Sequence, residues 1–226
     1  MELTTYLSFL ISPVILIVAL VFIYYYYKPG SWKNIRNAVV YGMAGVVIII
    51  VANYITDAVW HNNLFNLRRI TFFVFVTIAL SAELGKFLPL RLYFYKQPGF
   101  RGPLESIRYS VIVSLSYSVI ATILFGLNIV GTDMLKEPLL FLYTYPFANI
   151  FFGIVAGFFM GLGKIRKNFL LIDEAVALFI TTFFHGVYYF SFISSDIRLF
   201  FVIIFGFIII GATLLVKSLS FQNEQS

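Results

Sequence analysis

Three ionisable side chains lie inside long apolar blocks of this sequence: Glu83, Lys86 and His185. An ionisable group inside a membrane costs roughly 2.5–3.5 kcal/mol, so it persists mainly where it pairs with another charge or lines a polar cavity. Glu83 and Lys86 are three residues apart on one helical face, close enough to pair as a structural ion pair or to serve a functional site. His185, in the segment FFHGVYYF, is either a hydrogen-bonded core histidine or a functional group.

Asn149 adds a polar side chain to the block 138–163, and an amide buried in a membrane must find hydrogen-bond partners. At a helical rise of 1.5 Å per residue, counted from the block ends predicted to be cytoplasmic, Asn149 and His185 lie about 20 Å deep and Glu83 about 12 Å deep. The four polar residues therefore fit one layer of the protein. We expect them to be mutually hydrogen-bonded and to fix the relative rotation of three helices.

The signature motifs of several hydrolase classes are missing from the sequence. It contains no G-x-S-x-G elbow, no H-E-x-x-H helix and no pair of aspartates in its apolar blocks. It also has no cysteine and only two histidines, which argues against a disulfide, an iron–sulfur cluster and a three-ligand metal site. We expect no metal centre and no bound cofactor.

The composition predicts the elements that must position these side chains. Of 226 residues, 61% are hydrophobic and 12% are charged, against about 25% charged in an ordinary soluble domain. The apolar residues form blocks of about 20, the length that crosses a bilayer as a helix. These blocks fall at about 7–27, 38–55, 70–90, 107–127, 138–163, 171–193 and 199–216. We expect an all-α, polytopic membrane bundle of about seven helices, with residues 1–226 as a single integral membrane domain.

The lysines and arginines predict how this bundle is oriented. Eleven of them fall on one side, around 28–36, 91–108, 164–167 and 217, and four fall on the other. Because cytoplasmic loops carry the basic excess, the N-terminus is expected outside and the C-terminus in the cytoplasm. The net charge of +6 is then a topology signal, and we expect no nucleic-acid partner.

Gly153, Gly157 and Gly161 form a stripe of small residues at four-residue spacing. In membrane helices such a stripe lets two backbones approach closely. We expect these glycines to serve helix packing.

Three segments, at 81–106, 145–164 and 184–190, resemble the PrsW family of glutamic-type intramembrane proteases, which is distantly similar to the CAAX-prenyl endopeptidases. The resemblance covers a core of about 71–190. It implies an intramembrane protease fold in a bacterial cytoplasmic (inner) membrane.

The family's polar motifs are only partly kept. Its E-E-x-x-K motif corresponds to Ala82-Glu83-Leu84-Gly85-Lys86, with alanine in place of the first glutamate, the residue implied to activate water in relatives. Its F-x-x-x-H motif ends on Asn149, and its H-x-x-x-N/D motif keeps His185 but ends on Tyr189. The family's membrane glutamate and asparagine are also replaced, within 114–122.

These replacements lead to three functional hypotheses. The first is a pseudoprotease that binds or scaffolds another integral membrane protein as a subunit of a complex, with membrane lipids around it. The second is a divergent, active endopeptidase that cleaves a transmembrane substrate, with Glu83 as base, His185 and Tyr189 as oxyanion donors and Asn149 orienting the water. A transporter or channel subunit ranks third.

Overall fold

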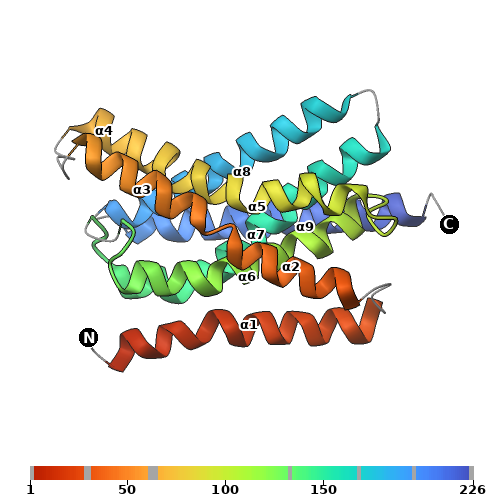
Figure 1. Ribbon diagram of the computed structural model, residues 1–226, viewed down its shortest axis with the longest axis horizontal. Coiled ribbons are helices and arrows are strands. Elements are labelled where there is room, and N and C mark those ends of the chain that lie inside the picture. Colours follow the sequence, from red (N-terminus) through yellow and green to blue (C-terminus); the bar gives the residue numbers. More distant parts are fainter. Residues whose placement is uncertain are drawn as a thin grey trace.

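The computed structural model describes residues 3–27, 32–60, 66–131, 134–166, 169–194 and 197–223, and these ranges are almost entirely helical (Figure 1). Seven helical spans in this part of the chain are long and apolar enough to cross a membrane, as the composition predicts. The all-helical membrane bundle is therefore confirmed. The sidedness of the two termini stays a prediction.

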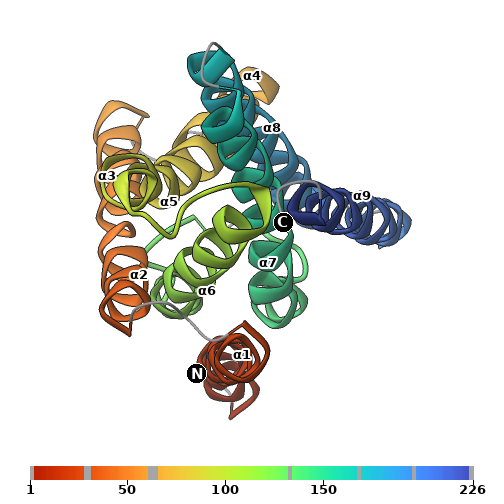
Figure 2. The ribbon, with the colours of Figure 1, turned by 90° about the vertical axis from the view of Figure 1, so that its right-hand side faces the viewer.

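Five of the seven spans are single α-helices, and each overlaps one of the predicted apolar blocks. The first span is α1 (Leu3–Tyr27), and the last four are α6 (Pro103–Gly126), α7 (Pro138–Ile165), α8 (Leu170–Ile193) and α9 (Ile197–Asn223). Both α6 and α7 begin with proline, whose fixed φ and missing N–H suit the first helical position. Seen end-on, α7 lies inside the bundle, while α1 and α9 lie at its edge (Figure 2).

The second span is broken in the middle. It consists of α2 (Trp32–Ala44) and α3 (Val47–Trp60), which meet at Gly45. A Cβ built on Gly45 would lie 2.3 Å from the carbonyl oxygen of Gly85, so the two backbones are in direct contact there. The continuous block expected at 38–55 is thus two helices, and the break presses against the helix that carries Glu83 and Lys86.

The third span changes its winding before it reaches Glu83. It runs through α4 (Leu67–Phe72), the π-helical segment η1 (Phe73–Leu80), α5 (Ser81–Leu92) and a short 3₁₀ turn, η2 (Phe94–Lys96). The Ser81 hydroxyl donates to the carbonyl oxygens of Thr77 and Ile78, and the Thr77 hydroxyl is bonded to that of Thr56 at 2.8 Å. These bonds tie the π segment both to the start of α5 and to α3. Because π segments often occur at functional sites, the position of this one directly before Glu83 makes the region around Glu83 a candidate functional site.

The stripe of glycines on α7 faces α6. A Cβ on Gly153, Gly157 or Gly161 would lie 2.4–2.9 Å from backbone atoms of α6. The two helices therefore approach each other backbone to backbone, as small residues in membrane helices permit. This close packing holds α7, and with it Asn149, at a fixed position inside the bundle.

Candidate functional site

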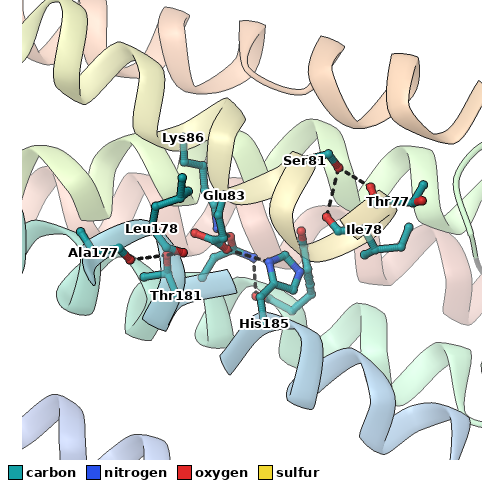
Figure 3. A network of polar contacts seen from close by, with 11 residues as sticks. Thr77, Ile78, Ser81, Glu83, Lys86, Ala177, Leu178, Thr181 and His185 are labelled. Atoms are coloured by element: carbon teal, nitrogen blue, oxygen red, sulfur yellow. Dashed lines mark hydrogen bonds and ion pairs between the residues drawn. The ribbon is translucent and has the colours of Figure 1, made fainter. Parts of the chain in front are cut away.

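Glu83 lies at the centre of a buried polar cluster between α5 and α8. Its Oε1 accepts a hydrogen bond from Lys86 Nζ at 2.6 Å and lies 2.7 Å from His185 Nδ1, the contact that Figure 3 draws between the two residues. Both α5 residues are 2% exposed and His185 is fully buried. The carboxylate oxygen is thus shared between an ammonium and an imidazole away from water.

Asn149 on α7 completes the cluster through Lys86. Its Oδ1 accepts from Lys86 Nζ at 2.9 Å, and its Nδ2 donates to the carbonyl oxygen of Tyr145 one turn earlier. Both polar ends of the amide are therefore used. The structure brings four of the five sequence-predicted site residues together from three spans.

Tyr189, the fifth predicted residue, lies in a different environment. Its ring packs edge-on against Phe141 and near Phe125, and its hydroxyl lies 3.1 Å from the position of a Cβ on Gly131. Gly131 follows the end of α6, where its positive φ of 43° suits glycine. Tyr189 thus reaches toward the loop between α6 and α7 rather than toward the cluster.

Aromatic rings enclose the charged groups. Lys86 Nζ lies 5.0 Å from the ring centre of Phe152 and 5.5 Å from that of Tyr117, within the range of a cation–π interaction. Phe152 also stacks on the His185 ring, with ring centres 4.7 Å apart. These two aromatic residues were not predicted from the sequence, because 19% of the residues are aromatic and nothing in their spacing sets these two apart.

Lys86 and Glu83 balance each other's charge, so the cluster is neutral when His185 is neutral. Among the described residues, His185 Nε2 and the Tyr117 hydroxyl are buried without a hydrogen-bond partner. Unpaired buried polar atoms of this kind are where an internal water would bind. Chemically, the arrangement is a closed ion pair with one histidine nitrogen still available.

The cluster offers few ligands to a metal ion. Within the described ranges no three Asp, Glu, His or Cys side chains lie close enough to hold one. Thr181, which precedes His185 by one turn of α8, donates its hydroxyl to the carbonyl oxygen of Ala177 and so is engaged within its own helix (Figure 3). Among the side chains of these four types, the described cluster contains Glu83 and His185.

Replacing Asn149 with leucine tests the link between α7 and the ion pair. We expect Asn149→Leu to lower the free energy of unfolding by about 1–3 kcal/mol, because the buried Lys86 ammonium loses one of its two hydrogen-bond acceptors. Thermal unfolding in mild detergent measures the loss. Phe147→Leu is the control, since Phe147 is 56% exposed on the same helix, and it should change stability by less than about 0.5 kcal/mol. Equal effects of the two changes would contradict the prediction.

Comparison with known proteins agrees with the motifs. The family model described as PrsW family intramembrane metalloprotease matches residues 30–214, a wider region than the resembling core at 71–190. No curated protein and no solved structure matches the chain. The match takes in all four members of the polar cluster, α2 to α8 and the larger part of α9, and it extends over most of the chain. The chain therefore belongs to the PrsW family of intramembrane proteases.

Proposed function

We propose that this chain is a non-catalytic member of the PrsW family that acts by binding another integral membrane protein. The observation that carries the proposal is the state of Glu83, whose Oε1 is held by both Lys86 and His185 in a buried cluster. A general base for hydrolysis needs a free lone pair within about 3 Å of the attacking water. An oxygen shared between an ammonium and an imidazole is a poor candidate for this task.

The residues that replace the family's polar groups suit an ion pair better than a hydrolytic site. Ala82, at the position of the first family glutamate, is fully buried and brings no carboxylate. Asn149, at the position of the family histidine, accepts a hydrogen bond from the Lys86 ammonium, and its amide cannot act as a base as a histidine can. Each replacement is therefore consistent with a core that is neutral and closed.

The description of the family as metalloproteases implies a metal ion, and the donors present do not fit one. A catalytic zinc takes three protein ligands and keeps a further position open. Here the two ligand-type side chains are Glu83 and His185, and the Lys86 ammonium lies 2.6 Å from Glu83 Oε1 and 2.9 Å from Asn149 Oδ1. The oxygens that would face a metal already face a cation of the protein.

The family fold that the chain keeps supports the binding of another membrane protein. The family match over residues 30–214 supports a shared intramembrane protease fold, and we infer that the chain keeps the ability of that fold to hold a transmembrane segment. The partner would then be held without being cut. We place this complex in a bacterial cytoplasmic membrane, with the C-terminus of the chain inside the cell.

An active protease is the second candidate, and one observation favours it. Glu83 contacts His185 Nδ1, while His185 Nε2 has no partner among the described residues. A carboxylate that orients an imidazole with one free nitrogen is an arrangement found in general acid–base catalysis. In this candidate His185, oriented by Glu83, would transfer the proton.

Co-purification distinguishes the two candidates. The wild-type protein and the double variant Glu83→Gln/Lys86→Met are expressed at native level and isolated in mild detergent, and bound proteins are quantified by mass spectrometry. The double variant removes the carboxylate without leaving a buried ammonium unpaired. We expect one membrane protein in equal, near-stoichiometric amount with both. A protein that is intact with the variant and fragmented with wild type would overturn the proposal and assign the cleavage to Glu83.

A further inference from the structure

Two contacts between ionisable side chains join α5 to α8 at separate depths. The first is the contact of Glu83 with His185 in the polar cluster (Figure 3). The second is an ion pair between Arg91 and Glu174, whose Nε and Oε1 atoms lie 2.6 Å apart. Arg91 lies about 12 Å further along α5 than Glu83, toward the side predicted to be cytoplasmic. The ion pair therefore closes the cytoplasmic end of the seam that leads to the cluster.

The other helix contacts around the cluster are made by backbone and cannot separate easily. The break between α2 and α3 meets α5 backbone to backbone at Gly45 and Gly85, and the glycine stripe of α7 meets α6 in the same way. On the far side of the cluster, the ring of Phe75 in the π segment packs directly onto Gly186 of α8. The part of the wall that can move away from α5 is thus the first half of α8, before His185.

The first half of α8 is buried along one narrow stripe. The buried residues of this stripe are Asp173, Glu174, Ala177 and Thr181. The exposed large side chains of the same half are Leu171, Ile172, Phe179 and Phe183. Between the two polar contacts, Ala177 shares an apolar cluster with Leu90 of α5, and Phe87 packs against that cluster. The seam is therefore a thin apolar layer with an ion pair at its cytoplasmic end.

The Arg91–Glu174 pair is suited to opening and closing. The Arg91 side chain is 31% exposed, so its guanidinium can return to water when the pair separates. An ion pair with a solvent-exposed partner contributes little net stability, and so it biases an equilibrium without locking it. Arg91 also lies 5.1 Å from the ring centre of Tyr95, whose carbonyl oxygen accepts from Lys164 at the end of α7. These contacts hold the end of α5 against α7, which leaves α8 as the helix that can move.

We propose that the α5–α8 seam is a gate between the membrane and the Glu83 cluster, and that the Arg91–Glu174 ion pair is the latch that holds it closed. When the pair separates, the first half of α8 moves away from α5 about the Phe75–Gly186 contact. The opening admits the part of a partner's transmembrane segment that lies in the cytoplasmic half of the bilayer. The gate deepens the proposed function, on which it rests, because it is the route by which the bound membrane protein reaches the cluster.

Cysteine labelling measures the opening of the gate without a partner. The chain has no cysteine, so a single introduced cysteine is a unique reporter. Thr181→Cys places it on the buried stripe of α8, where the threonine hydroxyl donates to the carbonyl oxygen of Ala177 in its own helix. Ser118→Cys is the matched reporter, because Ser118 is buried on α6 and its hydroxyl also donates within its own helix, to Leu115. Reaction with N-ethylmaleimide in mild detergent is followed by mass spectrometry.

Two neighbouring substitutions separate the latch from a general effect of charge. Glu174→Gln removes the charge of the latch, whereas Asp173→Asn weakens the pair with Arg166, which joins α8 to the end of α7 and not to α5. We expect Glu174→Gln to raise the labelling rate of Thr181→Cys about threefold to fivefold, the effect of a partly exposed ion pair on an opening equilibrium. Asp173→Asn should leave that rate unchanged. Ser118→Cys should label equally slowly with and without either substitution.

The outcomes that would overturn the gate are distinct from those that would overturn the proposed function. An unchanged rate with Glu174→Gln, or an equal rise with Asp173→Asn, would overturn the latch. A parallel rise at Ser118→Cys would mean that the whole bundle loosens, and would overturn it as well. The labelling uses the purified chain alone, so a gate that opens in a chain with no co-purifying protein would contradict only the proposed function. A co-purifying protein together with a closed gate would contradict only the gate.

Discussion

Lys86→Met is expected to destabilise the protein by about 3–5 kcal/mol, because it leaves the buried Glu83 carboxylate without its ammonium partner. Methionine keeps the length and apolar character of the lysine stem, so packing changes little while the charge is lost. The 2.6 Å contact to Glu83 and the 2.9 Å contact to Asn149 both disappear. Thermal and denaturant unfolding in mild detergent, followed by circular dichroism, measures the loss.

The double variant Glu83→Gln/Lys86→Met is the control for this prediction. It removes both charges, so it should recover most of the stability that Lys86→Met loses, since replacing a whole buried ion pair is often nearly neutral. A Lys86→Met protein as stable as wild type would mean that Glu83 is in contact with water. That result would also strengthen the case for catalysis, because a hydrated carboxylate can act as a base.

The polar cluster could be anticipated from the sequence because charge in a membrane is costly. That cost singles out Glu83, Lys86 and His185, the need of a buried amide for partners adds Asn149, and their estimated depths fit one layer. Their contacts join residues 63 and 102 positions apart in the chain. Such long-range pairs are expected because few polar side chains lie inside the bundle and each of them needs a partner there.

The backbone irregularities around the cluster could not be anticipated. The π segment at Phe73–Leu80 and the helix break at Gly45 lie within continuous apolar blocks, where hydropathy is the same for any helical winding. Both depend on tertiary contacts: Thr77 with Thr56, and Gly45 with Gly85. Tyr189 is a similar case. Its position in the motif predicts a place in the site, but the rotation of α8, which depends on tertiary packing, directs its hydroxyl toward Gly131.

The joint between α6 and α7 is a close packing contact that a single methyl group can test. A Cβ on Gly157 would lie 2.5 Å from Ile107 Cα and 2.7 Å from Ile107 N, and backbone atoms cannot move aside as a side chain can. Gly157→Ala therefore forces the two helices apart. We expect a loss of about 1–3 kcal/mol, the usual cost of overpacking, measured by thermal unfolding in mild detergent.

Gly206→Ala provides the matched control, because no described heavy atom outside its own helix backbone lies within 4 Å of a Cβ at Gly206. The same substitution in a membrane helix should there be neutral or stabilise by up to about 1 kcal/mol, since alanine favours helix more than glycine does. Opposite signs at the two positions would show that Gly157 is required for close approach rather than for flexibility.

Because α7 carries Asn149, separating α6 from α7 should also weaken the hydrogen bond from Lys86 to Asn149. Adding Asn149→Leu to Gly157→Ala should therefore cost less than the sum of the two single losses. Strict additivity would mean that the helix joint and the polar cluster are stabilised independently.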